Sequence, residues 1–460
     1  MADAFLRALA VVLFVFTTWL FGAVARRLSA PALVGEVVAG MVLGPKGLDA
    51  VPHDEAFALI GAVGLALLVL EGGLHVELAT LRRVGKVAFA VALSGTVLPL
   101  ATAWAALALL PAFRSREGLL CGTALSSTAI GMAAQLMGDL GVLDAELGQV
   151  VVTAAMFDDV LSLCLLAMVS KGLGDGAFAL FLPLLSSAAF ICVTVALAYK
   201  TPEWLGALRQ RRQFTDAAWR DGLLALALGL CVALSAAAHF AKSTHLLGAF
   251  MAGVSLAAVD GGAAAETFDD RVGPVSAWTS RVFFASIGFV VPVGRLFSAP
   301  ALLYGALLAF LAVGSKVVTG VFDWERRYEV GWAMVGRGEL GFVMATETFK
   351  RGETSSLAFS ITVWALLVAT LVSPIVLRRL LPAPPPARAA ADEDVGALKA
   401  EVARLRRDLA AARAEDAAMA RVIRRLSPPK GRRPSRDLAA EPVVVEPPDE
   451  APIFGCSGLY

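Results

Sequence analysis

Thirteen apolar stretches, most of them about 17–25 residues long, follow one another along the first 380 residues of the chain, and stretches of this length cross a bilayer. The second and ninth are short and contain glycine, so their boundaries are loose. Lipid offers no hydrogen bonds to a backbone, so such segments are expected to be helices. Hydrophobic residues make up 58% of the sequence and charged residues 17%, which excludes a disordered chain and an ordinary cytosolic enzyme. The stretches are 4–25, 31–48, 56–74, 87–111, 118–140, 147–170, 177–199, 222–241, 244–259, 273–292, 301–322, 329–349 and 355–378. The fold class predicted is an all-α polytopic membrane protein.

The basic residues predict how these spans are oriented. Loops and span ends on the face reached after odd-numbered spans hold 16 Lys and Arg, whereas the other face holds 9. Because positive charge accumulates on the cytoplasmic side, the N-terminus is expected outside and the C-terminus in the cytoplasm. The segment Lys200–Asp221, with five basic residues, is predicted as a cytoplasmic loop. The near balance of 40 basic and 39 acidic residues gives no reason to expect nucleic acid as a partner.

Beyond residue 380 the composition becomes polar, and four regions are predicted. Residues 1–380 form the transmembrane domain, and the Pro-rich stretch 381–394 forms a stiff linker. Residues 395–427 carry apolar residues at heptad spacing, from Val395 and Leu398 to Ile423 and Leu426, with one polar exception at Asp416. This pattern predicts a parallel coiled coil and hence a homodimer, or alternatively an amphipathic helix lying on the bilayer. Residues 428–460 are predicted to be disordered.

Two adjacent carboxylates lie inside the apolar span 147–170. Asp158 and Asp159 would each cost several kcal/mol in a bilayer unless they were paired, hydrated or protonated. Neighbouring residues on a helix point about 100° apart, so the two aspartates are expected to face different partners. Such a pair holds a metal cation when ionised and protons when neutral. That is the chemistry of ion–proton exchange.

A buried lysine is the second unexpected charge. Lys316 lies inside the span 301–322, where an ammonium needs a carboxylate partner, and either aspartate is a candidate. A lysine released from its aspartate can then carry a proton of its own. The alternative is that Lys316 reaches the membrane interface near Asp323.

Two spans contain residues that interrupt a helix. Ser126–Gly131 is polar and flexible in the middle of the span 118–140, and it includes Ser127 and Thr128. Gly336–Gly341, in the span 329–349, carries three glycines together with Arg337 and Glu339. Discontinuous helices at corresponding places in two halves of a chain mark the binding sites of transporters. Arg337 and Glu339 are expected to compensate the partial charges of the interrupted helix ends.

The order of five motifs resembles the monovalent cation:proton antiporter superfamily, in its bacterial second branch. The motifs are Pro31–Pro45, Leu70–Leu74 leading to Leu81–Gly85, Gly248–Gly253, Phe283–Gly288 and Gly336–Gly341. The resemblance implies thirteen helices in inverted repeats, with two crossing broken helices and a core that moves against a dimerisation domain.

For the site, the resemblance implies that Asp159 is the essential carboxylate, that Asp158 pairs with Lys316, and that Thr128 lines the break. It also implies a bacterial inner membrane. Some sodium-type relatives have a polar residue where this chain has Ala129, and Ser126–Ile130 looks more like the potassium-efflux branch.

The function predicted is electrogenic exchange of sodium, lithium or potassium for protons by elevator-type alternating access, without a cofactor. One alternative is a potassium–proton antiporter of the potassium-efflux type, and others are a cation channel without proton coupling or a membrane sensor. An enzyme is not expected, because the four histidines are scattered and no nucleophile–base constellation accompanies them.

Overall fold

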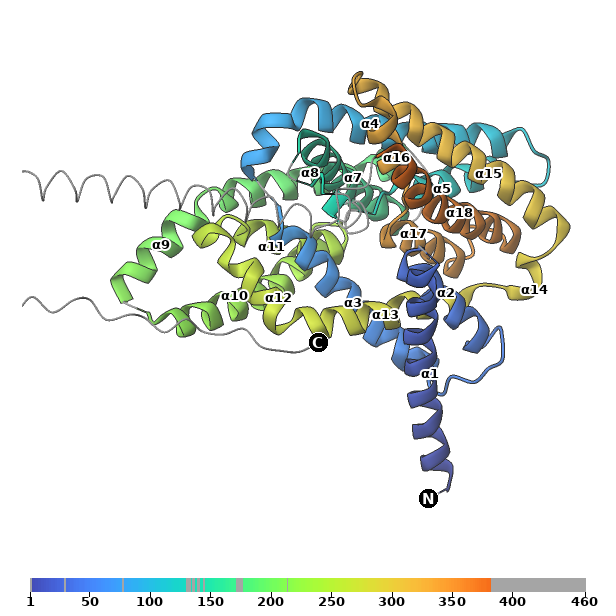
Figure 1. The fold of residues 1–460 in the computed structure, drawn as a ribbon, viewed down its shortest axis with the longest axis horizontal. Helices are drawn as coiled ribbons and strands as arrows, with labels where there is room; N and C mark the ends of the chain where they lie inside the picture. The colour runs from blue at the N-terminus through green and yellow to red at the C-terminus, as the bar shows by residue number, and fades with distance from the viewer. Residues whose placement is uncertain are drawn as a thin grey trace, which may run out of the picture. The chain divides into compact units, whose positions relative to one another are not determined.

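The computed structural model describes residues 2–381 apart from 29, 77, 130–133, 135–136, 139–140, 144, 171–176 and 213. Contacts divide the chain into the units 1–384 and 385–460, and the second unit lies outside the described residues. The predicted coiled coil and disordered tail therefore lie outside them too. The described part is helical, and no residue in it belongs to a strand (Figure 1).

The helices follow the predicted apolar stretches closely. The first half of the chain contains α1 (Ala2–Arg27), α2 (Ala32–Leu43), α3 (Asp54–Leu74), α4 (Leu78–Ala108), α5 (Ser115–Ser126), α7 (Glu146–Ser170), α8 (Ala177–Ala198) and α9 (Thr201–Arg212). The second half contains α10 (Asp216–Phe240), α11 (His245–Leu256), η1 (Val259–Gly262), α12 (Ala263–Arg271), α13 (Gly273–Val290), α14 (Val293–Leu296), α15 (Ala299–Val318), η2 (Thr319–Phe322), α16 (Arg327–Ala333), α17 (Glu339–Lys350) and α18 (Ser356–Leu380).

Eight helices of the described residues are long and apolar enough to cross a membrane, or nine if the bent pair formed by α11 and η1–α12 counts as one span. This pair bends by 104°. The bend lies where Asp260, Gly261 and Gly262 have φ values of 53°, 69° and 98°, a left-handed conformation that helices cannot contain. Helix α12 therefore turns away from the direction of α11.

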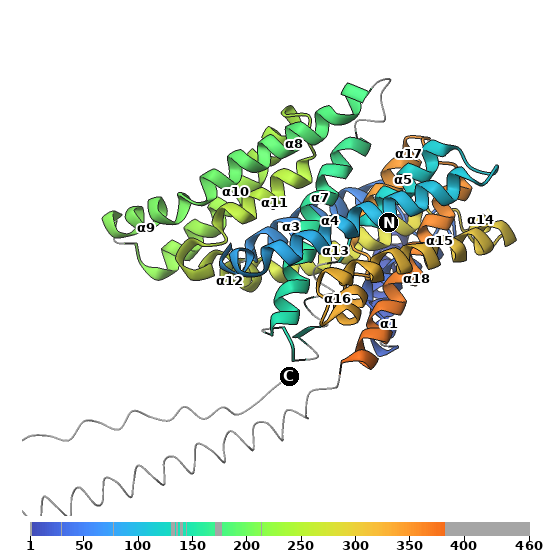
Figure 2. The same ribbon diagram turned by 90° about the horizontal axis from the view of Figure 1, so that it is seen from above.

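Glycines allow two pairs of these helices to approach closely. A Cβ on Gly288 of α13 would lie 2.4 Å from the backbone nitrogen of Met41 in α2, and one on Gly253 of α11 would lie 2.3 Å from the carbonyl oxygen of Leu70 in α3. Within lipid, close contact between helix backbones replaces the hydrophobic effect as a source of stability. These helices are in contact in sequence, α2 with α13, α13 with α3 and α3 with α11, and Figure 1 shows all four below α7, while Figure 2 shows α3 between α11 and α13.

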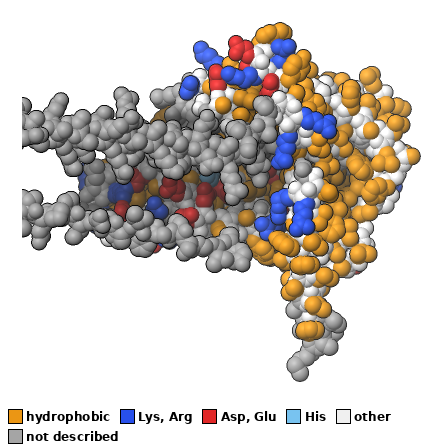
Figure 3. All heavy atoms as spheres, in the orientation of Figure 1, with side chains coloured by type: hydrophobic (Ala, Val, Ile, Leu, Met, Phe, Trp, Pro, Cys, Tyr) orange, Lys and Arg blue, Asp and Glu red, His pale blue; other side chains and the backbone are white. Residues whose placement is uncertain are grey.

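Large hydrophobic side chains are exposed on the outer helices, as expected of a surface in contact with lipid. Figure 3 shows them over α15 and along α1. Examples are Phe310 of α15, which is 75% exposed, and Val12 of α1, which is 64% exposed.

The segment 200–221 differs from the prediction. It is not a simple loop, because residues 201–212 form the helix α9. Leu205 of α9 is buried, whereas the basic residues lie in its last turn. A single buried apolar residue in a basic segment gives too little periodicity for sequence reasoning to distinguish a short helix from a loop.

Candidate functional site

Two interrupted helices meet at the predicted positions. Helix α5 ends at Ser126, and Ser127 is extended (φ −66°, ψ 142°). The second interruption separates α16 from α17, and Gly338 at its end is extended as well (φ −97°, ψ −178°). The two breaks are joined by hydrogen bonds: the Ala129 amide donates to the Gly336 carbonyl at 3.1 Å, and the Thr128 hydroxyl donates to the Met334 carbonyl at 3.4 Å.

The breaks leave helix ends inside the protein. The carbonyls that end α5 and the amides that begin α17 lack partners within their own helices, so the first end carries partial negative charge and the second partial positive charge. Glu339 is the first residue of α17, where a carboxylate is favourable. The charge-compensating role of Glu339 stays a prediction.

Asp158 of α7 and Lys316 of α15 form an ion pair, and both side chains are completely buried. The Lys316 ammonium lies 3.3 Å from Asp158 Oδ1 and 3.4 Å from Oδ2, and it donates a shorter bond of 2.7 Å to the Thr128 hydroxyl. The Lys316 ammonium thus lies in the protein interior, paired with Asp158 and not with Asp323. The choice of Asp158 over Asp159 as its partner is a feature of the tertiary structure.

Thr96 of α4 is a site residue that the sequence did not reveal. Its hydroxyl donates to Asp158 Oδ1 at 3.0 Å. It also lies 3.0 Å from the Ala92 carbonyl four residues earlier, which is the usual partner of a threonine within a helix. A threonine in a predicted helix is expected to bond to this local carbonyl, so the sequence gives no sign that the Thr96 hydroxyl also bonds to Asp158. Next to it, Gly95 leaves room for the lysine, since a Cβ there would lie 3.0 Å from Lys316 Nζ.

Asp159 lies beside the ion pair but in different surroundings. It is half-buried, and its carboxyl interacts electrostatically with Glu339, Asp158 and Lys316. Among the described residues, no side chain donates a hydrogen bond to it. One carboxylate of the pair is therefore held by a lysine and a threonine, while the other accepts no side-chain hydrogen bond within the described part of the chain.

Arg337 and Ser127 take positions that the sequence did not specify. Arg337 is completely buried and donates to the Ala312 carbonyl of α15 at 2.6 Å, while its Nε and Nη1 have no partner in the described part of the chain. It does not form an ion pair with Glu339 there. The Ser127 hydroxyl donates to the Ala124 carbonyl at 3.5 Å. It contacts neither aspartate among the described side chains.

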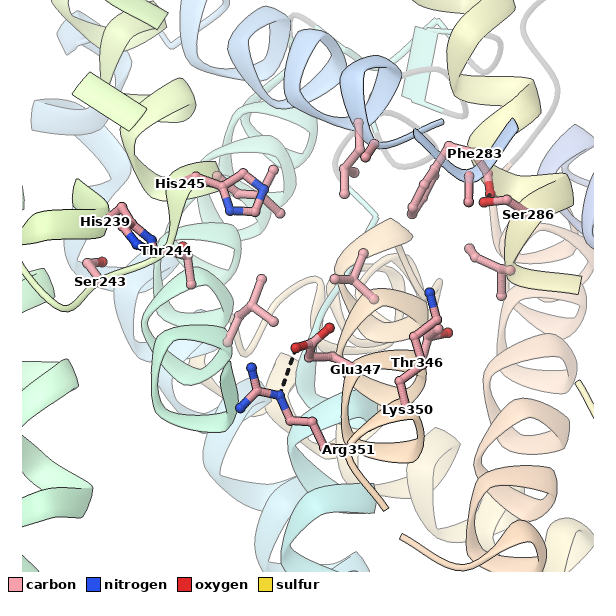
Figure 4. A pocket seen from close by; sticks show the side chains of 17 residues that line it. His239, Ser243, Thr244, His245, Phe283, Ser286, Thr346, Glu347, Lys350 and Arg351 are labelled. Atoms are coloured by element: carbon pink, nitrogen blue, oxygen red, sulfur yellow. Dashed lines mark hydrogen bonds and ion pairs between the residues drawn. The ribbon is translucent and has the colours of Figure 1, made fainter. Parts of the chain in front are cut away.

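A cavity of about 360 Å³ lies between α7 and α17 on one side and α3, α11 and α13 on the other. Leu166 lines it seven residues after Asp159, and Val343 lines it four residues after Glu339, so each shares a helix face with its carboxylate. Figure 4 shows Glu347 of α17 within this cavity, paired with Arg351 at 2.7 Å and lying across from His245.

No group of three or more His, Cys, Asp or Glu side chains in the described residues is arranged to hold a metal ion. A cation held between Asp158 and Asp159 would meet carboxylate oxygens from these two side chains.

Comparison with known proteins shows the family to which the chain belongs. The family profile described as "Sodium/hydrogen exchanger, transmembrane" matches residues 11–383, which is most of the chain. The chain belongs to this family. It is therefore a multi-pass membrane protein and a secondary transporter, not an enzyme.

Curated relatives are similar over most of their own length. The chain is 25% identical over 381 residues to the Na(+)/H(+)-K(+) antiporter GerN of Bacillus cereus, covering 80% of this chain and 94% of GerN. It is 26% identical to the high-affinity Na(+)/H(+) antiporter NhaS3 of Synechocystis, covering 80% and 88% of the two chains. The solved structure of the sodium proton antiporter MjNhaP1 from Methanocaldococcus jannaschii aligns with a TM-score of 0.61 at 16% identity. That alignment covers 82% of this chain and 95% of MjNhaP1 and shows a shared fold.

Proposed function

We propose that this protein exchanges a monovalent cation, sodium in the first place, for protons. The observation that carries the proposal is the buried contact between Lys316 and Asp158 at the junction of two helix breaks, with Asp159 available beside it. Cation and protons compete for the same carboxylates, and this competition couples the two fluxes without covalent chemistry. Linkage then requires that a higher proton concentration lowers the affinity for the cation.

Each site residue has a distinct part in the proposed cycle. Asp159 is the essential carboxylate, which binds the cation when ionised and a proton when neutral. Asp158 alternates between Lys316 and the cation, because a cation drawn to both carboxylates competes with the ammonium. If Lys316 gives up a proton when it loses Asp158, two protons move against one cation, and the exchange carries net charge.

The side chains at the two breaks hold the site together. Thr128 accepts a hydrogen bond from Lys316 and is therefore placed to supply an oxygen to the cation once the lysine has moved. The nearby Ser127 is proposed as a further oxygen ligand. Arg337, tied to Ala312 one helical turn before Lys316, and Glu339, at the start of α17, balance the charge of the broken helices.

Alternating access is proposed to follow an elevator-type movement of the helices that carry the site. The cavity supports this, because it separates α7 and α17, which bear or adjoin the carboxylates, from α3, α11 and α13. On α7, Asp159 precedes the lining residue Leu166 by about two helical turns. On α17, Glu339 precedes the lining residue Val343 by about one turn. The movement would close this opening and expose the carboxylates on the other face.

The wider architecture belongs to the same proposal. Thirteen spans in inverted repeats place the N-terminus outside and the C-terminus in the cytoplasm of a bacterial inner membrane. Residues 395–427 join two copies into a homodimer through a parallel coiled coil, after the linker 381–394 and before the tail 428–460.

A potassium–proton antiporter is the second candidate. Ala129 after Thr128 and the run Ser126–Ile130 favour it, and GerN is named for both sodium and potassium. The paired aspartates with their lysine favour the sodium-type exchange. Ion identity is therefore the first quantity to measure.

Proteoliposomes of known orientation test the proposal. A pH gradient is imposed, its collapse is followed with a fluorescent dye, and sodium, lithium or potassium is added in turn. We expect collapse that depends on the cation, that is lost in Asp159→Asn and that persists in the control Asp270→Asn, whose side chain is exposed on α12. Exchange at the wild-type rate in Asp159→Asn would refute the site. Cation flux without proton movement would indicate a channel, and no response to any ion would indicate a sensor.

A further inference from the structure

Two hydroxyl groups on the helices that border the cavity have no hydrogen-bond partner in the described part of the chain. They are Ser162 Oγ on α7 and Thr346 Oγ1 on α17, and both atoms are buried. The whole side chain of Ser162 is enclosed, with 0% exposure. A buried hydroxyl without a partner costs free energy, so each of these two groups needs an explanation.

A serine or threonine in a helix normally satisfies its hydroxyl locally, by donating to a carbonyl three or four residues earlier. Ser187 of α8 and Thr348 of α17 do so, at 2.7 Å and 2.9 Å. Ser162 and Thr346 make no such bond within the described residues. Helix chemistry alone therefore does not account for these two side chains.

Ser162 is placed next to both aspartates of the site. It follows Asp158 by four residues and Asp159 by three, the two spacings at which side chains on a helix are neighbours. One turn earlier, the position with the same two spacings holds Ala155, which has no side-chain oxygen. Of the two positions on α7 that neighbour both carboxylates, 162 is thus the one that offers an oxygen.

The same face of α7 leads to the cavity. Leu166, four residues after Ser162, lines it, and on α17 Thr346 lines it seven residues after Glu339. At a rise of about 1.5 Å per residue, Ser162 lies about 5 Å beyond Asp159 and Thr346 about 10 Å beyond Glu339. Helices α7 and α17 are in contact, and each passes from its carboxylate toward the cavity, where Figure 4 shows Thr346. The two hydroxyls therefore lie at successive levels between the carboxylates and the cavity.

We propose that Ser162 is a further cation ligand, which coordinates the ion together with Asp159 on the cavity side of the carboxylates. Its hydroxyl oxygen replaces a water of hydration as the cation passes from the cavity to the site, as protein oxygens do in ion-selective pores. The cation then supplies the partner that the described residues do not. This inference rests on the proposed cation–proton exchange and adds a ligand to its site.

Equilibrium binding of radioactive sodium to the purified full chain in detergent tests the proposal, at alkaline pH where few protons compete. Ser162→Ala should weaken sodium binding about threefold to tenfold, the effect of losing one polar contact. It should not lower the unfolding temperature, because no hydrogen bond among the described residues is lost. Ser360→Ala is the matched control: Ser360 is also completely buried, but its hydroxyl donates to the Ser356 carbonyl of α18 at 2.7 Å. This variant should bind sodium like the wild type.

Thr346→Val separates a ligand from a general effect of cavity polarity. Thr346 is too far along the route to hold the same ion, so this variant should leave the sodium dissociation constant unchanged. Equal weakening by Thr346→Val and Ser162→Ala would overturn the proposal, and so would a lower unfolding temperature in Ser162→Ala, which would indicate a structural partner.

The variant Asp159→Asn distinguishes this inference from the function on which it rests. Sodium binding that is lost in Asp159→Asn but normal in Ser162→Ala would refute the role of Ser162 alone. Sodium binding that is absent in the wild type, or unaffected by Asp159→Asn, would refute the proposed exchange site and the inference together.

Discussion

The buried ion pair offers the sharpest test of the structure. We consider Asp158→Asn, Lys316→Met and the double variant. Asp158→Asn keeps the size of the side chain and an oxygen that can accept from Thr96. Among the described residues, it leaves the Lys316 ammonium hydrogen-bonded to the neutral Thr128 hydroxyl, with Asp159 as a neighbouring charge. Lys316→Met leaves the Asp158 carboxylate, within the described part of the chain, with the Thr96 hydrogen bond and the charge of Arg337. Each single change thus leaves one buried charge without its hydrogen-bonded counterion.

The expected magnitudes follow from this geometry. Breaking a buried pair by removing one partner costs about 3–5 kcal/mol, whereas replacing both partners with neutral groups costs much less. Both side chains are completely buried, so solvent screens neither loss. The double variant should therefore be more stable than the sum of the single effects predicts, by about 3 kcal/mol or more.

Unfolding in mixed detergent micelles measures these free energies. The control cycle combines Lys316→Met with Asp270→Asn, whose effects should add within about 0.5 kcal/mol because the two residues share no partner. If the effects of Asp158→Asn and Lys316→Met are also additive within that margin, the two groups are not coupled. The assignment of Lys316 to Asp158 would then have to be abandoned.

Two further predictions concern the surroundings of this pair. Thr96→Val keeps the shape of the side chain but removes its hydrogen bond to Asp158. One such bond contributes about 1 kcal/mol, so the apparent cation affinity in the proteoliposome assay should change by about tenfold or less. Gly341→Ala would place a Cβ 2.6 Å from the Ala124 carbonyl oxygen and 2.7 Å from the Ser127 hydroxyl oxygen. Although alanine favours helices, this crowding should destabilise the fold by about 1–3 kcal/mol and slow exchange.

Matched changes separate these effects from general damage. Thr102→Val on α4 removes a hydroxyl that bonds only to its own helix, and it should leave the cation affinity unchanged. Gly314→Ala adds a methyl group where no atom lies within 4 Å, so both stability and exchange should be retained. If Gly341→Ala behaves like Gly314→Ala, the close packing of the two breaks is not required.

Much of the fold was predictable because the membrane limits what a chain can do. The apolar stretches coincide with helices to within a few residues at most boundaries, and both interruptions, at Ser127 and before Gly338, fall inside the segments indicated by polar residues and glycines. The bend at Asp260 was not predicted. It depends on backbone angles over three residues, and hydropathy carries no information about these.

Local composition was enough to identify the ionisable side chains of the site. Asp158, Asp159, Lys316 and Arg337 stand out because an ionisable group in an apolar span has a high energetic cost, and that cost depends only on local composition. The residues alone left the partner of Lys316 open between the two aspartates, the family resemblance implied Asp158, and the packing of the helices selects the partners that are observed. Lys316 meets Asp158 across 158 positions of the chain, Thr96 joins them from α4, and Arg337 turns to a carbonyl of α15. These choices depend on how the helices are placed in space, and hydropathy does not record that placement.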